Sequence, residues 1–178
     1  MTDLKSLNIE EIQDFVVKHN FPKYRAEQIF RWINTGVSSF DEMKNIPKDL
    51  RSKLSEYYYI SVVNIEKKQV SSYDNTVKYL FKFGDGECVE SVVMSYHHGY
   101  TICISTQVGC KMGCKFCATG MQGFTRDLTP GEMLCQIETA QKDLGIRISN
   151  IVLMGMGEPL DNFDNVVRFI HLVSSEKG

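Results

Sequence analysis

Three cysteines within eight residues constrain this chain more than any other feature of its sequence. Cys110, Cys114 and Cys117 stand at C-x3-C-x2-C spacing, and no fourth cysteine lies immediately beside them. A four-iron cluster closed by four thiolates carries electrons, whereas three thiolates leave one iron open to an outside ligand. The spacing therefore predicts an iron–sulfur site with an open iron, which favours a catalytic cluster over one that only carries electrons.

The same thiols could instead hold structural zinc, with a distant cysteine or a histidine as the fourth ligand. Structural zinc sites usually come as two paired knuckles of closely spaced ligands. No second knuckle exists among the four histidines, which are His19, His97, His98 and His171. The pattern therefore favours iron over zinc.

Charge and hydropathy restrict the class of protein further. The formal net charge of -2 argues against binding nucleic acid through bulk charge, so a nucleic-acid partner requires a local basic patch. The N-terminus lacks a basic segment followed by an apolar run, and no stretch approaches the ~18 apolar residues of a membrane span. Six cysteines in such a chain indicate reduced thiols for metal binding or catalysis, which predicts a cytoplasmic protein without membrane contact.

Residues 1–59 predict a helical accessory domain. Asn8 can cap a first helix with Glu11 at the capping-box position, and two further helices are predicted over about 22–35 and 47–57. Their apolar residues indicate a core, and their lysines and arginines indicate a solvated face. The alternative is a small helical module whose basic residues contact RNA phosphates.

Residues 60–98 predict an antiparallel β extension. The segments 77–83 and 88–93 are strongly β-prone and flank the turn signal Gly84-Asp85-Gly86, so they should form a hairpin. An earlier strand over 62–70 would complete a small sheet, and residues 96–100 are predicted to be a loop.

Residues 99–178 alternate strands with helices. The predicted elements are a strand over 101–105, a helix over 130–144, a buried strand over 151–154 and a helix over 163–173. This repeat is typical of a parallel α/β sheet or barrel, whose active sites lie on the loops that follow strands. The predicted fold class is therefore α/β, with the cysteine loop and the loop Gly155–Pro159 at the same end of the sheet.

The residues around the cysteines resemble the radical S-adenosylmethionine (radical SAM) superfamily. Aromatic Phe116 precedes the last thiol, and a glycine–glutamate loop follows the next strand. In that superfamily S-adenosylmethionine (SAM) binds the open iron of a [4Fe-4S] cluster, and an electron from the cluster cleaves SAM to a radical. The resemblance implies a partial radical SAM (β/α) barrel and accounts for the missing fourth thiolate.

Longer motifs narrow the resemblance to one family. They are CISTQVGC from Cys103, CATGMQGF from Cys117, GMGEPL from Gly155, and the N-terminal segments 24–28 and 40–43. These closely resemble the RlmN family of dual-specificity methyltransferases, which act on C2 of adenine in 23S ribosomal RNA and transfer RNA. The resemblance implies both RNAs as partners and an external electron donor such as flavodoxin.

The resemblance also implies roles in holding the cluster and SAM. Cys110, Cys114 and Cys117 would ligate the cluster, Phe116 would present its backbone near the SAM adenine, and Gly157 with Glu158 would receive the SAM amino group. A buried carboxylate suits that positive group electrostatically. Without the cysteines, the glycine–glutamate loop would be interpreted as an ordinary strand-to-helix turn.

Two further residues have implied catalytic roles. Cys103 matches the cysteine that ends the reaction by forming a disulfide, and Glu90 matches a glutamate that accepts a proton. Judged alone, Cys103 would be an inert core thiol, as Cys88 and Cys135 are interpreted, and Glu90 would be a surface carboxylate. Only the resemblance assigns catalytic roles to these two residues.

The chain departs from the family at its C-terminus. The family's methyl-carrying cysteine lies near the C-terminus, whereas this chain stops at Gly178 after two β/α units, and a full barrel needs about 250 residues. We therefore expect an incomplete enzyme that is inactive alone and has an open sheet edge. The alternatives are the related C8-methyltransferase of ribosomal RNA and a metal-structured RNA-binding module without catalysis.

Overall fold

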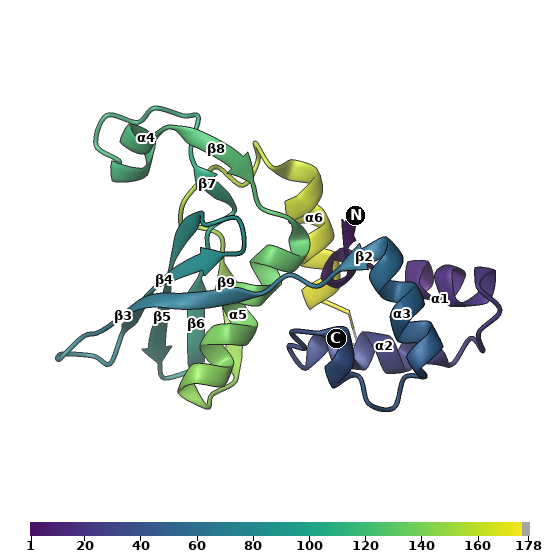
Figure 1. The fold of residues 1–178 in the computed structure, drawn as a ribbon. Helices are drawn as coiled ribbons and strands as arrows, with labels where there is room; N and C mark the ends of the chain where they lie inside the picture. Colours follow the sequence, from purple (N-terminus) through teal and green to yellow (C-terminus); the bar gives the residue numbers. More distant parts are fainter. Residues whose placement is uncertain (176–178) are drawn as a thin grey trace.

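A computed structural model describes residues 1–175, in which a helical N-terminal part lies beside a larger α/β part (Figure 1). The N-terminal elements are β1 (Thr2–Asp3), η1 (Leu4–Ser6), α1 (Ile9–Lys18), α2 (Arg25–Asn34), η2 (Phe40–Glu42), α3 (Lys48–Tyr57) and β2 (Tyr58–Tyr59). The short strands β1 and β2 pair in parallel, so the first and last elements of this part lie side by side. The three predicted helices are thus confirmed.

Local sequence signals explain where the first helix begins. The Asn8 side chain accepts a hydrogen bond from Glu11 N, and the Glu11 carboxylate accepts one from Asn8 N, both at 2.9 Å. This capping box satisfies backbone N–H groups that the first turn leaves without partners. Buried apolar residues of all three helices, including Ile12, Phe30 and Leu50, then form one core of their own.

A five-stranded sheet with the order β3-β4-β5-β6-β9 forms the centre of the α/β part. Its strands are β3 (Val63–Val70), β4 (Val77–Phe83), β5 (Cys88–Tyr96), β6 (Gly99–Cys103) and β9 (Ile148–Val152). Neighbours from β3 to β6 run antiparallel, and β6 pairs with β9 in parallel. One sheet therefore crosses the predicted boundary between 98 and 99, and the three-domain division stays a prediction.

Two expectations about this sheet are wrong in detail. Residues 96–100 are not a loop, because β5 continues to Tyr96 and pairs there with Gly99 of β6, whose φ is 120°. Only His97 and His98 form the tight turn between the two strands. The strand predicted over 151–154 begins earlier, at Ile148, and it is not buried. It lies at the edge of the sheet, and Met154 just beyond it is 81% exposed.

Helix α5 (Pro130–Leu144) covers one face of the sheet, and α6 (Phe163–Val173) packs beside it. Thr129 and Glu132 form a capping box at its start, and Gly145, with φ 64°, ends it. Side chains of the sheet bond directly to this helix. Ser91 donates to Gln136 at 2.7 Å, and the Tyr79 hydroxyl donates to Asp143 at 2.6 Å.

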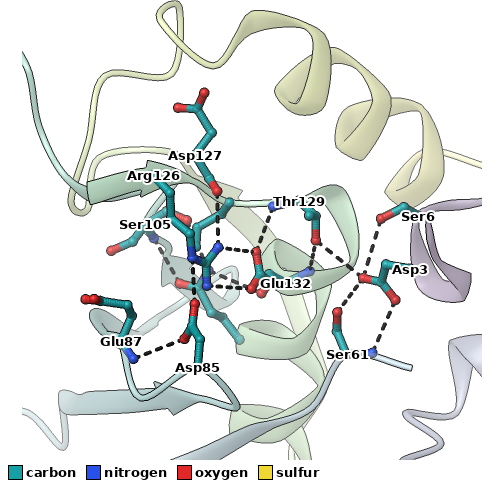
Figure 2. A network of polar contacts seen from close by, with 12 residues as sticks. Asp3, Ser6, Ser61, Asp85, Glu87, Ser105, Arg126, Asp127, Thr129 and Glu132 are labelled. Carbon is teal, nitrogen blue, oxygen red and sulfur yellow. Dashed lines mark hydrogen bonds and ion pairs between the residues drawn. The ribbon is translucent and has the colours of Figure 1, made fainter. Parts of the chain in front are cut away.

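A polar network joins the N-terminal part to the start of α5 (Figure 2). Asp3 is only 2% exposed, and its carboxylate accepts hydrogen bonds from the backbone N–H groups of Lys5 and Ser61. The hydroxyls of Ser6, Ser61 and Thr129 donate to the same carboxylate. Burial raises the pKa of Asp3 above its ordinary value, although these hydrogen bonds act in the opposite direction.

Arg126 ties the loop after β4 to the same region. Its guanidinium donates to both carboxylate oxygens of Glu132 at 2.8 Å and to Asp85 at 2.7 Å. Such a fork matches carboxylate geometry in a way that a lysine does not. Among residues 1–175, no helix is long and apolar enough to cross a membrane.

Candidate cluster and cofactor site

The three clustered cysteines lie on a loop that projects from the sheet (Figure 1). The loop leaves β7 (Gln107–Gly109), passes through the short helix α4 (Ala118–Gln122) and returns on β8 (Phe124–Asp127), which pairs antiparallel with β7. Cys110 N donates to Gly123 O at 2.9 Å and closes the base of the loop. A β-carbon on Gly109 would lie 1.8 Å from Gly123 O, so the two strands approach too closely for any other residue.

The side chains of this loop include three thiols, the residue type that binds iron–sulfur clusters. Cys114 is exposed, and Cys110 and Cys117 are half-buried, so all three are accessible. The backbone N–H groups of Gly120 and Thr119 donate to the Cys117 sulfur and lower the pKa of its thiol, which favours the thiolate that binds metal. Within residues 1–175, no three cysteine, histidine or acidic side chains converge in a metal-holding arrangement.

The glycine–glutamate loop after β9 lies directly beside the end of β6. Gly155 N donates to Ile104 O at 3.0 Å, and Thr106 N donates to Met156 O at 2.9 Å. A β-carbon on Gly155 would lie 2.7 Å from the carbonyl of Ile104, so glycine permits this close approach. The predicted meeting of the two loops at one end of the sheet is confirmed.

The buried side chain of Gln107 connects several segments of the site, a role that the sequence did not predict. Its side-chain oxygen accepts a hydrogen bond from Glu158 N at 2.9 Å, and its amide nitrogen donates to Asp127 and Asp161, both at 2.8 Å. Asp161 also pairs with Lys111 of the cysteine loop at 3.0 Å. The hydrogen bond from Gln107 and the Lys111 charge hold the pKa of Asp161 below its ordinary value.

The contacts around Gln107 link three segments that are separate in the sequence: β7, the glycine–glutamate loop and the cysteine loop. Gly157, with φ 98°, rests against Gln107, where a β-carbon would lie 2.6 Å from the Gln107 β-carbon. The sequence carries no signal for this role, because the burial of the Gln107 amide is visible only in the folded chain. Phe116 lies outside these contacts, and its side chain is 94% exposed.

Cys103 and Glu90 share one face of the sheet. Cys103 pairs with Val92, and Glu90 lies two residues earlier on the same strand as Val92, so both side chains point away from α5. Burial raises the pKa of the half-buried Cys103 thiol. The Glu90 carboxylate forms an ion pair with Lys78 at 2.7 Å.

Of the remaining cysteines, Cys135 lies in the core and Cys88 does not. Cys135 is 1% exposed, donates to Ser61 O and accepts from the ammonium of Lys5, and burial raises its pKa to about 12. Cys88 is half-exposed, because it begins β5 beside the hairpin turn, so its interpretation as a core thiol is wrong. All six cysteines are free thiols, and the disulfide expected of Cys103 is not present.

Comparisons with known proteins agree with this arrangement. Residues 104–178 match the radical SAM superfamily, and residues 2–60 match the family described as the ribosomal RNA large subunit methyltransferase N-terminal domain. The crystal structure of a radical SAM methyltransferase from Sphaerobacter thermophilus superimposes with a TM-score of 0.88 at 37% identity. The match covers 100% of this chain and 53% of the Sphaerobacter chain. The fold and the cysteine loop thus define a radical SAM protein.

Sequence relatives sharpen this class to a family. A probable dual-specificity RNA methyltransferase RlmN from Alkaliphilus oremlandii is 53% identical over 99% of this chain and 51% of its own length. The protein of the same name from Clostridium tetani is 50% identical over 100% of this chain and 51% of its own length. The chain is similar to RlmN-family proteins over its whole length, and it spans about half the length of the curated relatives it matches.

Proposed function

We propose that this chain supplies the [4Fe-4S] cluster and part of the SAM site of a methyltransferase that modifies C2 of adenine in 23S ribosomal RNA and transfer RNA. The observation that carries the proposal is the junction of the cysteine loop and the glycine–glutamate loop. Gln107 bonds to Glu158 and to Asp161, and Lys111 of the cysteine loop pairs with Asp161. Two segments that would hold a cluster and its SAM ligand are therefore tied to one buried side chain.

Cys110, Cys114 and Cys117 would hold the cluster. When bound, the cluster supplies the electron that cleaves SAM, and it receives that electron from an external donor such as flavodoxin. Gly157 and Glu158 would receive the SAM amino group, with the carboxylate attracting its positive charge. Gln107 holds this loop in place by accepting the Glu158 N–H. Phe116 would lie near the SAM adenine through its backbone.

The substrate end of the site lies on the exposed face of the sheet. Adenine C2 carries no acidic proton, so a polar methyl transfer finds no nucleophile there, and a radical route is required. Glu90 would accept the proton that leaves C2, and its half-exposed carboxylate can reach a base brought to that face. Cys103, on the same face, would act in the release of the methylated base.

Anaerobic reconstitution with iron and sulfide tests the proposal. We expect about four irons and four sulfides per chain, visible absorbance from the cluster, and SAM cleavage under reductant detected by mass spectrometry. Cys114→Ser should lose all three properties. Cys88→Ser is the matched control, because it removes a half-exposed thiol outside the loop, and it should retain them.

Other outcomes would redirect the assignment. Zinc without iron, together with RNA binding that is insensitive to Cys114→Ser, contradicts the enzyme and supports a metal-structured RNA-binding module. If RNA is methylated, mass-spectrometric mapping of the modified adenine separates C2 from C8 chemistry.

A further inference from the structure

The central sheet has two faces with different chemistry. One face carries Tyr79 and Ser91 and is covered by α5 through direct hydrogen bonds. The opposite face alternates with it along β4 and β5 and stays half-exposed within residues 1–175. This open face carries both Glu90 and Cys103.

The strand register places a lysine in line with each of these two residues. In one row across the sheet, Lys78 pairs with Val92, and Val92 pairs with Cys103. In the next row, Lys67 pairs with Leu80, and Leu80 pairs with Glu90. Each lysine is two strands away, which corresponds to about 10 Å between backbones.

We propose that Lys67 and Lys78 bind backbone phosphates of the substrate RNA and present the target adenine to Glu90 and Cys103. This inference rests on the proposed function, and it adds the surface by which the RNA is held. A nucleotide extruded from its helix must place its base in the site while its phosphate stays outside. Two strand spacings are comparable to the reach of a nucleotide from its base edge to its phosphate.

The charged side chains on this face are exposed enough to exchange their partners. Lys78 pairs with Glu90 at 2.7 Å, and the two side chains are 44% and 46% exposed. Ion pairs this exposed contribute little to folding, so the lysine can exchange its carboxylate partner for a phosphate at small cost. The pair also keeps the lysine extended over the face before RNA binds. A chain with a net charge of -2 needs such a local basic surface to meet RNA.

The opposite face offers a matched comparison. Lys68 follows Lys67 directly, but it pairs with Tyr79 in the sheet and forms an ion pair with Asp143 of α5. Lys53 on α3 forms a comparable exposed pair with Glu56 in the helical part. Neutralising Lys53 and Lys68 changes the net charge as much as neutralising Lys67 and Lys78, without touching the open face.

Binding of a fluorescein-labelled transfer RNA transcript, measured by anisotropy over a series of salt concentrations, tests the inference. We expect Lys67→Gln/Lys78→Gln to weaken binding on the order of tenfold and to lower the salt slope by roughly 0.7–0.9 per lost phosphate contact. Lys53→Gln/Lys68→Gln should bind like the wild type. Glu90→Gln should bind at least as tightly as the wild type, because it removes the competing carboxylate. Thermal unfolding of each variant verifies that it is folded.

Three results would overturn the inference: equal weakening by the two double variants, no change in the salt slope, or a Glu90→Gln variant that binds as weakly as the Lys67→Gln/Lys78→Gln variant. SAM cleavage by the reconstituted chain, which needs no RNA, keeps the proposed function separable. A chain that cleaves SAM and binds transfer RNA equally well without Lys67 and Lys78 refutes the phosphate surface and leaves the enzyme assignment standing.

Discussion

The Asp3 carboxylate occupies the space that a β-carbon on Gly131 would need. Such a carbon would lie 1.9 Å from Asp3 Oδ2. Gly131 belongs to the first turn of α5, and its N–H donates to the Ser6 hydroxyl at 3.0 Å. The contact of Asp3 with the start of α5 therefore requires a glycine at position 131.

Gly131→Ala should destabilise the protein by roughly 1–3 kcal/mol, the usual cost of inserting a carbon into a well-packed site. Asp3 cannot move aside cheaply, because it is buried and accepts hydrogen bonds from the two parts that it joins. Urea unfolding measures the change.

Gly84→Ala is the control for this substitution, because nothing lies within 4 Å of a β-carbon at that turn position. Its effect should stay within about 0.5 kcal/mol. Equal free energies of unfolding for the two variants would contradict the steric account.

Asp3 should also make stability depend on pH. Its pKa in the folded protein is raised above the unfolded value by burial. A raised pKa means that the folded state prefers the protonated carboxyl, so this contribution is complete below the unfolded pKa and is lost as pH rises through the folded pKa. The free energy of unfolding of the wild type minus that of Asp3→Asn should therefore fall as pH rises from acid toward neutral. Urea unfolding of both proteins at a series of pH values measures it, and a difference that rises with pH would refute the direction.

The elements that could be predicted from the sequence are those with local signals. Helix α5 begins at the Thr129 cap and ends at Gly145, as its capping residues indicate, and the hairpin of β4 and β5 turns at the predicted glycines. The candidate site could be anticipated in part for the same reason. Its cysteines lie close together in sequence, and its two loops each follow a strand.

The rest depends on contacts between residues that are far apart in sequence. Lys5 lies in a terminal segment without periodicity, yet it is 2% exposed because it bonds to Cys135 and Glu138, more than a hundred residues away. The β7–β8 ribbon has strands too short for a pattern. Gln107 looks like any polar residue until Glu158 and Asp161 are folded against it.

Arg126→Lys should lower stability although it keeps the positive charge. The guanidinium contacts both oxygens of Glu132 and also Asp85, and an ammonium cannot reproduce that fork. We expect a loss of roughly 1–2 kcal/mol, discounted because Arg126 is partly exposed. Thermal unfolding measures the loss, with exposed Arg147→Lys as the control. Indistinguishable midpoints for the two variants would show that the charge alone matters.

Gln107→Ala should loosen the glycine–glutamate loop more than it unfolds the protein. The change removes the acceptor of the Glu158 N–H and leaves Asp127 and Asp161 without their amide donor. A buried group that loses its partner costs about 1–3 kcal/mol. The amide of Glu158 should then exchange with deuterium faster, while amides in the centre of α5 keep their relative protection. Gln69→Ala, on the exposed strand β3, changes the same residue type and should leave the Glu158 amide unaffected. If Gln107→Ala protects that amide as well as the wild type does, Gln107 does not hold the loop.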